Sequence, residues 1–181
     1  TTPEQHLERS RWVLDTFFPW EGERCHDVAL TDPLGTLAGR FPPTVRHPVG
    51  RLPSGRLVLG LADAVVLNDP ITGQGSNNAA KAAAVYLRRI LERGEGPFDA
   101  AWMQDTFEQS WDYAGKVVGW TNALLGPPPP HVLQLLGAAG SHAAIAHRFV
   151  NGFDYPPDFY EWFMDPGQAE AYLAEVSSRS G

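Results

Sequence analysis

The segment from Arg56 to Ala84 combines four local signals in order, and it restricts the fold more than any other part of the chain. A short apolar run, Leu57 to Leu61, predicts a buried strand, and the carboxylate of Asp63 follows it. A loop rich in proline and glycine then leads into an alanine-rich helix, predicted over residues 76–93. A helix start offers unpaired N–H groups and a positive dipole end, and glycines let a ligand approach the backbone closely. The pattern predicts a site for a polar, electron-rich ligand.

The loop itself, residues 68–77, is called the glycine loop below. It reads Asn68-Asp69-Pro70-Ile71-Thr72-Gly73-Gln74-Gly75-Ser76-Asn77. This wording resembles the second flavin-binding motif of FAD-dependent aromatic monooxygenases, in which a Gly-Asp pair precedes Pro-x-x-Gly-Gln-Gly-x-Asn. It looks most like the styrene and indole monooxygenase branch of that family. Ala62-Asp63 stands where the family has Gly-Asp, so the backbone has less room there.

The resemblance is strong over residues 45–91, whereas Leu7 to Phe41 and Phe98 to Leu173 show only a general likeness. It implies that Asp63 accepts hydrogen bonds from the ribityl hydroxyls of FAD, since a carboxylate can accept from two hydroxyls. It also implies that the glycine loop faces the flavin ring. The implied cofactor-binding residues are Asp63, Pro70, Gly73, Gln74, Gly75, Ser76 and Asn77. The competing interpretation is a capping carboxylate followed by an ordinary helix-entry loop.

The family resemblance also implies an activity. Reduced FAD would come from an NAD(P)H-dependent flavin reductase, and a flavin C4a-(hydro)peroxide would epoxidise or hydroxylate an aromatic alkene or indole-type substrate. Pro70 and Ile71 would border the space where oxygen and the small aromatic substrate react, and no side chain would act as a catalytic nucleophile. Two alternatives stay open. One is another FAD-dependent aromatic hydroxylase or a halogenase-like oxidoreductase, and the other is a non-catalytic helical interaction domain.

The family binds the ADP part of FAD with a Gly-x-Gly-x-x-Gly segment after a first strand, and this sequence contains none. We therefore expect the C-terminal part of a longer α/β flavoprotein, inactive by itself. This part should be mainly α-helical with a few strands. The resemblance assigns residues 1–56 to the end of a substrate-binding domain, 57–96 to the last segment of the FAD-binding domain and 97–181 to a helical C-terminal region.

Composition and motif spacing argue against several other classes of protein. A net charge of −7 without a Lys/Arg cluster argues against nucleic-acid binding. No apolar run reaches the roughly 18 residues of a membrane span. The single cysteine, Cys25, excludes an internal disulfide and fits a reducing cytoplasm. His142 and His147 lack the spacing of a metal site, and no Gly-x-Ser-x-Gly supports a hydrolase.

The remaining pattern predicts mostly helices. A capping box at Thr2 and Gln5 starts a helix over Pro3 to Phe18, and Asp99 caps a long helix that ends near Gly126. Shorter helices are predicted over His131 to Leu136, Ser141 to Val150 (capped by Ser141), Asp158 to Met164, and Pro166 to Val176 (capped by Asp165).

Three further expectations concern packing. Edge strands or irregular crossovers are predicted at Leu37 to Phe41 and Thr44 to Val49, because Pro42, Pro43 and Pro48 disfavour a central strand. The stripe predicted to be buried on the alanine-rich helix is Ala80, Ala83, Ala84, Leu87 and Leu91. The aromatic segment Phe149 to Phe163 is interpreted as the core of a helical lobe, with a channel wall or a homodimer surface as alternatives.

Overall fold

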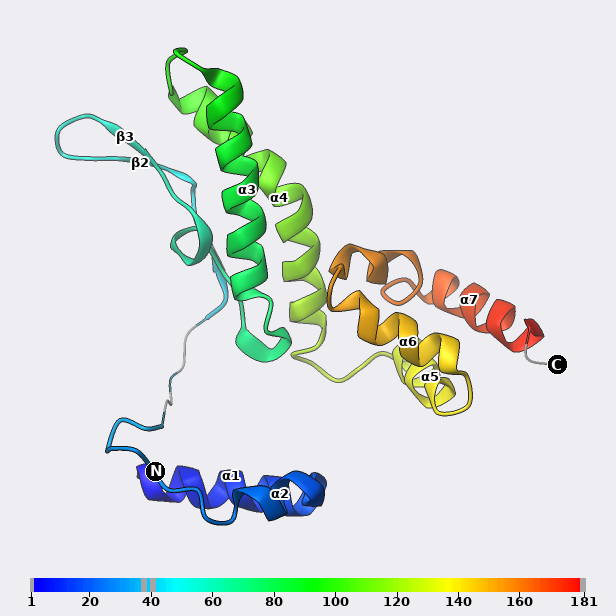
Figure 1. Ribbon diagram of the computed structural model, residues 1–181. Coiled ribbons are helices and arrows are strands. Elements are labelled where there is room, and N and C mark those ends of the chain that lie inside the picture. Colours follow the sequence, from blue (N-terminus) through cyan, green and yellow to red (C-terminus); the bar gives the residue numbers. More distant parts are fainter. Residues whose placement is uncertain (1, 37–38, 40–41, 180–181) are drawn as a thin grey trace. The chain divides into compact units, whose positions relative to one another are not determined.

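The computed structural model describes residues 2–36, 39 and 42–179 and divides the chain into two compact units, Thr1–Phe41 and Pro42–Gly181 (Figure 1). The described residues are mainly helical, with four short strands, as predicted for this chain. The α/β fold of a parent protein stays a prediction. The division of the chain into residues 1–56, 57–96 and 97–181 also stays a prediction. The strand predicted at Leu37 to Phe41 lies outside the described residues, apart from Gly39.

The first unit contains helices α1 (Pro3–Phe17) and α2 (Pro19–Cys25). The predicted capping box is confirmed, because the Thr2 hydroxyl accepts from the Gln5 N–H at 3.3 Å and the Thr2 N–H donates to Gln5 Oε1 at 2.9 Å. Pro19 ends α1 and also begins α2, since proline suits the first position of a helix. Only Gly22 is buried among the residues described in this unit, so it has no apolar core of its own.

The second unit begins with two antiparallel strand pairs. Strand β1 (Thr44–Val45) pairs with β4 (Val66–Leu67), and β2 (Val49–Arg51) pairs with β3 (Leu57–Leu59). A turn joins β2 to β3, as predicted, and Gly55 adopts the left-handed conformation there, with a φ of 82°.

The prediction of a buried strand at Leu57 to Leu61 is wrong in two respects. The strand ends at Leu59, and the side chains of Val58 and Leu61 are 41% and 38% exposed. A two-stranded ribbon has no neighbour on either edge, and no described element covers this one enough to bury it. Asp63 therefore lies in a short 3₁₀ turn, η1 (Ala62–Ala64), rather than at the end of a buried strand.

Helices α3 (Gly75–Arg93) and α4 (Ala100–Ala123) form a hairpin and lie side by side (Figure 1). The predicted cap of α4 is confirmed, because Asp99 Oδ1 accepts from the Trp102 N–H at 2.9 Å. Tyr86 of α3 and Phe107 of α4 are buried. An ion pair between Arg89 and Asp105 also joins the two helices.

The buried stripe predicted on α3 is wrong for this chain. The face that is buried or half-buried contains Asn78, Ala82 and Tyr86, because α4 and η1 pack against that side. Leu87 and Leu91 are 59% and 72% exposed instead. The exposed stripe, which we call the outer face of α3, consists of Ala80, Ala83, Ala84, Leu87 and Leu91.

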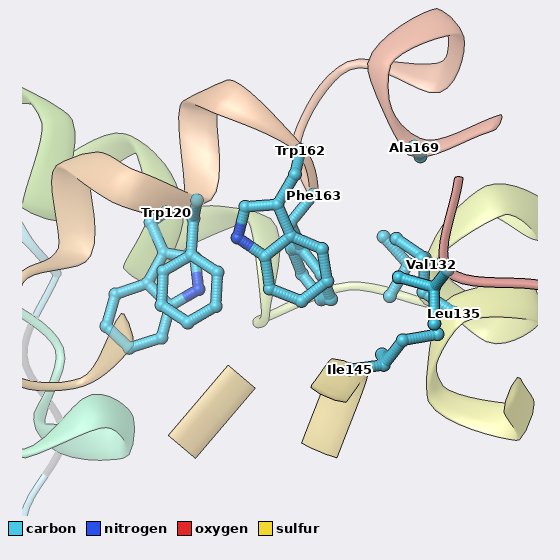
Figure 2. Close-up of a cluster of buried hydrophobic side chains, with 9 residues drawn as sticks. Trp120, Val132, Leu135, Ile145, Trp162, Phe163 and Ala169 are labelled. Carbon is cyan, nitrogen blue, oxygen red and sulfur yellow. The ribbon is translucent and has the colours of Figure 1, made fainter. Parts of the chain in front are cut away.

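The C-terminal lobe, residues 130–179, contains α5 (Pro130–Ala139), α6 (Ala143–Gly152), the 3₁₀ helix η3 (Pro156–Glu161) and α7 (Pro166–Arg179). Its core gathers aromatic and aliphatic side chains around the end of α4 (Figure 2). The buried members are Trp120, Val132, Leu135, Ile145, Phe159, Trp162, Phe163, Ala169 and Val176. The interpretation of Phe149 to Phe163 as part of the lobe's core is confirmed.

Two local predictions in the lobe are wrong, and one is confirmed. The N-cap of α6 is His142 rather than Ser141. The predicted helix from Asp158 to Met164 is instead a 3₁₀ helix that runs from Pro156 to Glu161. Asp165 caps α7 as expected, with its Oδ1 accepting from the Gln168 N–H at 3.0 Å.

One charged group stabilises the lobe internally. Arg148 donates to both carboxylate oxygens of Asp158, at 2.9 and 2.7 Å, and the Trp162 indole N–H donates to the same carboxylate at 3.0 Å. The guanidinium carbon also lies 4.8 Å from the ring centre of Tyr172. These hydrogen bonds, those from Arg148 first, lower the pKa of Asp158.

We predict that Asp158→Asn lowers the free energy of unfolding at neutral pH by about 1.5–3 kcal/mol, the range for hydrogen bonds to a charged group. The folded-state pKa of Asp158 is depressed, so its stabilisation is present above its ordinary pKa of about 3.9 and is lost as pH falls through the folded value. Urea unfolding from neutral to strongly acidic pH should show the gap between wild type and variant closing only below about pH 4.

Glu161→Gln is the matched control for this prediction. Its carboxylate lies 3.8 Å from the same guanidinium and its side chain is 75% exposed, so its loss should change stability little. Equal losses in the two variants, or a gap that does not depend on pH, would contradict the prediction.

Candidate functional site

The first predicted site residue, Asp63, occupies the middle of the η1 turn. Its main-chain carbonyl accepts from Arg46 Nη1 at 3.1 Å, which ties the turn to the first strand pair. Its side chain is exposed and has no hydrogen-bond partner within the described residues. The carboxylate is therefore available to a ligand rather than used as a cap.

Ala62, the residue before it, has a φ of +53° and is the only described residue other than glycine in that region. The left-handed conformation brings the Cβ of an L-residue too close to its own backbone, and glycine avoids this contact. The family that this sequence resembles has glycine at this position. The left-handed conformation gives a physical reason for a glycine here, and Ala62 adopts that conformation at a cost in strain.

The glycine loop is built from two tight turns. Asp69 Oδ1 accepts from the Ile71 N–H at 2.9 Å, which starts the 3₁₀ turn η2 (Pro70–Thr72). Gly73 then adopts a φ of +65°, which reverses the chain before α3. Pro70 and Ile71 are exposed on the outside of this turn.

The side chain of Gln74 points into the protein and joins the loop to the rest of the unit. Its Nε2 donates to the carbonyl of Phe153 at 2.7 Å, and its Oε1 accepts from Asn77 Nδ2 at 3.2 Å. Nearby, the hydroxyls of Thr72 and Thr121 share a buried hydrogen bond of 2.8 Å. Gln74 is 2% exposed and its carbonyl already accepts from the Asn78 N–H, so this residue serves the fold rather than an open binding surface.

The start of α3 keeps its donors free. Gly75, Ser76 and Asn77 are the first three helical residues, and their N–H groups have no acceptor within the described part of the chain. No side chain caps this end, because Gln74 bonds elsewhere. A Cβ placed on Gly75 would meet no described atom within 4 Å, so open space adjoins the backbone there.

The predicted site residues thus form two neighbouring segments, the η1 turn and the glycine loop. They lie close together, since Ala62 and Gly75 line one small cavity. The sequence did not predict two buried residues of this region, Asn68 and Asn78; among the described residues, neither the Nδ2 of Asn68 nor the Nδ2 and Oδ1 of Asn78 has a partner. Asn78 could have been identified because it shares a helical face with Ala82 and Tyr86 at a spacing of four residues.

No group of three His, Cys, Asp or Glu side chains is arranged to hold a metal ion in the part of the chain that the structure describes. Among the helices of the described residues, none combines the length and apolarity needed to cross a bilayer.

Known proteins add a comparison to this geometry. No protein-family model matches the chain. The styrene monooxygenase StyA of Pseudomonas fluorescens is 28% identical over 136 residues, which cover 74% of this chain and 32% of that protein. StyA of a Pseudomonas sp is 28% identical over 147 residues, covering 80% and 35%. This chain resembles styrene monooxygenases. The resemblance predicted from the glycine loop is thereby confirmed, and the chain spans about a third of the length of the curated relatives it matches.

The strained alanine yields a test of the site's local geometry in this StyA-like chain. We predict that Ala62→Gly raises the free energy of unfolding by up to about 1 kcal/mol. Glycine removes left-handed strain of about 1–2 kcal/mol, while its greater freedom in the unfolded chain offsets part of the gain. Urea unfolding of the purified variant measures the difference.

Ala64→Gly, in the same turn but without a positive φ, is the control and should be destabilised, because only the entropic cost remains. If both substitutions destabilise equally, the left-handed conformation of Ala62 is wrong.

Proposed function

We propose that this chain is the C-terminal part of an FAD-dependent monooxygenase that oxygenates a small aromatic alkene or indole-type substrate. The similarity to styrene monooxygenases supports the reaction class. The observation that carries the proposal is the start of α3, where the N–H groups of Gly75, Ser76 and Asn77 have no acceptor among the described residues and open space adjoins Gly75.

These residues fit a flavin by their chemistry. The N1–C2 carbonyl edge of the ring is electron-rich and accepts hydrogen bonds, and reduction increases its negative charge. Backbone donors at the positive end of a 19-residue helix suit that edge, and they need no rearrangement to do so. Gly75 permits close approach because it places no side chain between the ring and the helix start.

Asp63 would hold the ribityl chain of the cofactor. Its exposed carboxylate is acceptor-only and lacks a partner within the described residues, so it can accept from two hydroxyls. The η1 turn and the glycine loop neighbour one another through Ala62 and Gly75. One extended cofactor could therefore contact both segments.

FAD, when bound in reduced form, would supply the activation of oxygen. The chain's own residues would bind and orient the cofactor and exclude water. Pro70 and Ile71 are suited to the last role, since Ile71 is 56% exposed within the glycine loop and offers an apolar border to a substrate. A flavin reductase that uses NAD(P)H would be the partner that delivers reduced FAD.

The outer face of α3 supports the proposal that the chain is part of a larger protein. Its apolar residues recur with helical periodicity, yet no described residue buries them. Ala80, Ala83 and Ala84 are small, which lets a helix approach a sheet closely. We infer that a sheet in the remainder of the flavoprotein covers this face.

Gly75→Val tests the cofactor contact. In the longer flavoprotein that we propose to contain this chain, the variant should bind FAD roughly tenfold or more weakly, because the side chain would fill the space beside the helix start. Folding should be retained, since a Cβ at this position meets no described atom within 4 Å. Fluorescence titration with FAD measures the affinity, and circular dichroism measures folding.

The matched control for this experiment is Gly137→Val in α5, another helical glycine whose Cβ would meet no described atom within 4 Å. Its FAD affinity should be unchanged. A Gly75→Val protein that binds FAD as tightly as the control would show that the glycine loop does not contact the cofactor, and the proposal would be withdrawn.

Asp63→Ala tests the second contact in the same protein. Loss of hydrogen bonds to a charged group costs about 1.5–3 kcal/mol, which corresponds to roughly ten- to hundredfold weaker FAD binding. Asp112→Ala, on the exposed side of α4, removes the same charge elsewhere and should leave affinity unchanged. Unchanged affinity together with a much lower melting temperature for Asp63→Ala would instead identify Asp63 as a structural residue.

A further inference from the structure

A small cavity lies inside the second unit, between helices α3 and α4 and the segment from η1 to β4. Its volume is about 20 Å³, and its walls are mostly apolar. Three polar side chains also line it, namely Asn78 and Tyr86 of α3 and Ser110 of α4. Ala62 and Gly75, which belong to the two segments of the candidate site, form part of the same wall.

Asn78 is the unusual member of this wall. It is 7% exposed, and neither its Oδ1 nor its Nδ2 has a hydrogen-bond partner among the described residues. A buried amide without partners is costly, and most buried polar groups in proteins are satisfied. The helix itself does not require an asparagine here, because its hydrogen bond to the carbonyl of Gln74, at 2.9 Å, is made by the backbone N–H and not by the side chain. Some group other than the described protein atoms must satisfy the side chain.

The two hydroxyls of the cavity leave acceptor positions unused. Tyr86 donates its proton to the carbonyl of Gly60 at 2.9 Å, and Ser110 donates to the carbonyl of Phe107 at 2.7 Å. Each hydroxyl oxygen can still accept. The cavity therefore presents one amide donor, one amide acceptor and two hydroxyl acceptors around a shared space.

We propose that Asn78, Tyr86 and Ser110 bind one internal water molecule between α3 and α4. A water requires about 10–15 Å³ and two to four polar partners, and this cavity meets both conditions while excluding a larger solute. The water accepts from Asn78 Nδ2 and donates to the hydroxyl oxygens or to Asn78 Oδ1. It thereby joins the first turn of α3 to α4 beneath the η1 turn, whether or not a flavin binds.

The direct test is water–amide magnetisation transfer by NMR in the ¹⁵N-labelled 181-residue protein. The side-chain NH₂ of Asn78 should show a cross peak to a long-lived water, with opposite signs in the laboratory and rotating frames. The exposed side chain of Asn77, which bonds to Gln74, is the internal control and should show none. Absence of a long-lived water at Asn78, or an Asn78 amide bonded to a protein carbonyl, would overturn the proposal.

The melting temperature of an Asn78→Leu variant distinguishes a cavity that contains water from a dry one. If the water is present, leucine deprives Tyr86 and Ser110 of their shared partner, and the melting temperature should fall by roughly 2–8 °C. If the cavity is dry, leucine removes two unpaired polar groups and the melting temperature should rise. Asn122→Leu, an exposed asparagine in the last turn of α4 whose side chain has no partner among the described residues, provides the baseline for substituting asparagine by leucine in a helix. A rise for Asn78→Leu relative to this baseline would overturn the proposal.

Discussion

The buried amide of Gln74 connects the glycine loop to the C-terminal lobe, and the placement of the candidate site depends on this contact. Its Nε2 donates to a carbonyl just after α6, while its Oε1 holds the side chain of Asn77 in the first turn of α3. The Thr72–Thr121 hydrogen bond adds a second connection, from the same loop to the end of α4. Because Gln74, Thr72 and Thr121 are themselves buried, breaking either connection would leave a buried polar group unpaired. The start of α3 is thus held in a defined position.

The C-terminal lobe makes that connection rigid. Trp120 stacks on Phe159 and meets Phe153 edge-on, so the residue whose carbonyl receives Gln74 is itself packed against the core. The core in turn depends on Arg148, which satisfies Asp158 and lies over the ring of Tyr172 in α7. The C-terminal lobe contains none of the predicted site residues, but its packing determines the geometry of the glycine loop, which contains most of them. This arrangement gives the lobe a positioning role in the proposed flavoprotein.

The helix start shows how far local sequence could predict the site. Gly73 and Gly75 were expected to let a ligand approach the backbone closely; the structure shows open space at Gly75 and a positive φ at Gly73, which the sequence did not predict. Gln74 was also expected to bind the cofactor, but its side chain serves the fold, since its partner lies 79 residues away in the chain. Asn78 was overlooked although it shares a helical face with Ala82 and Tyr86, because that spacing alone does not show which face of α3 is covered. Long-range partners of this kind have no signature in nearby residues.

The amino-acid sequence alone determined the helical character, the caps at Thr2, Asp99 and Asp165, and the glycine loop that reveals the resemblance to styrene monooxygenases. These features depend on hydrogen bonds and backbone preferences within a few residues. Only the tertiary structure decided which face of α3 is buried. Periodicity identifies residues that share a face, but burial depends on what packs against it, and here α4 and η1 cover the face of Asn78 and Tyr86 and leave Leu87 and Leu91 exposed. Strand β3 gives a second example. Its apolar residues predicted a buried strand, but no described sheet or helix buries the ribbon that β3 forms with β2.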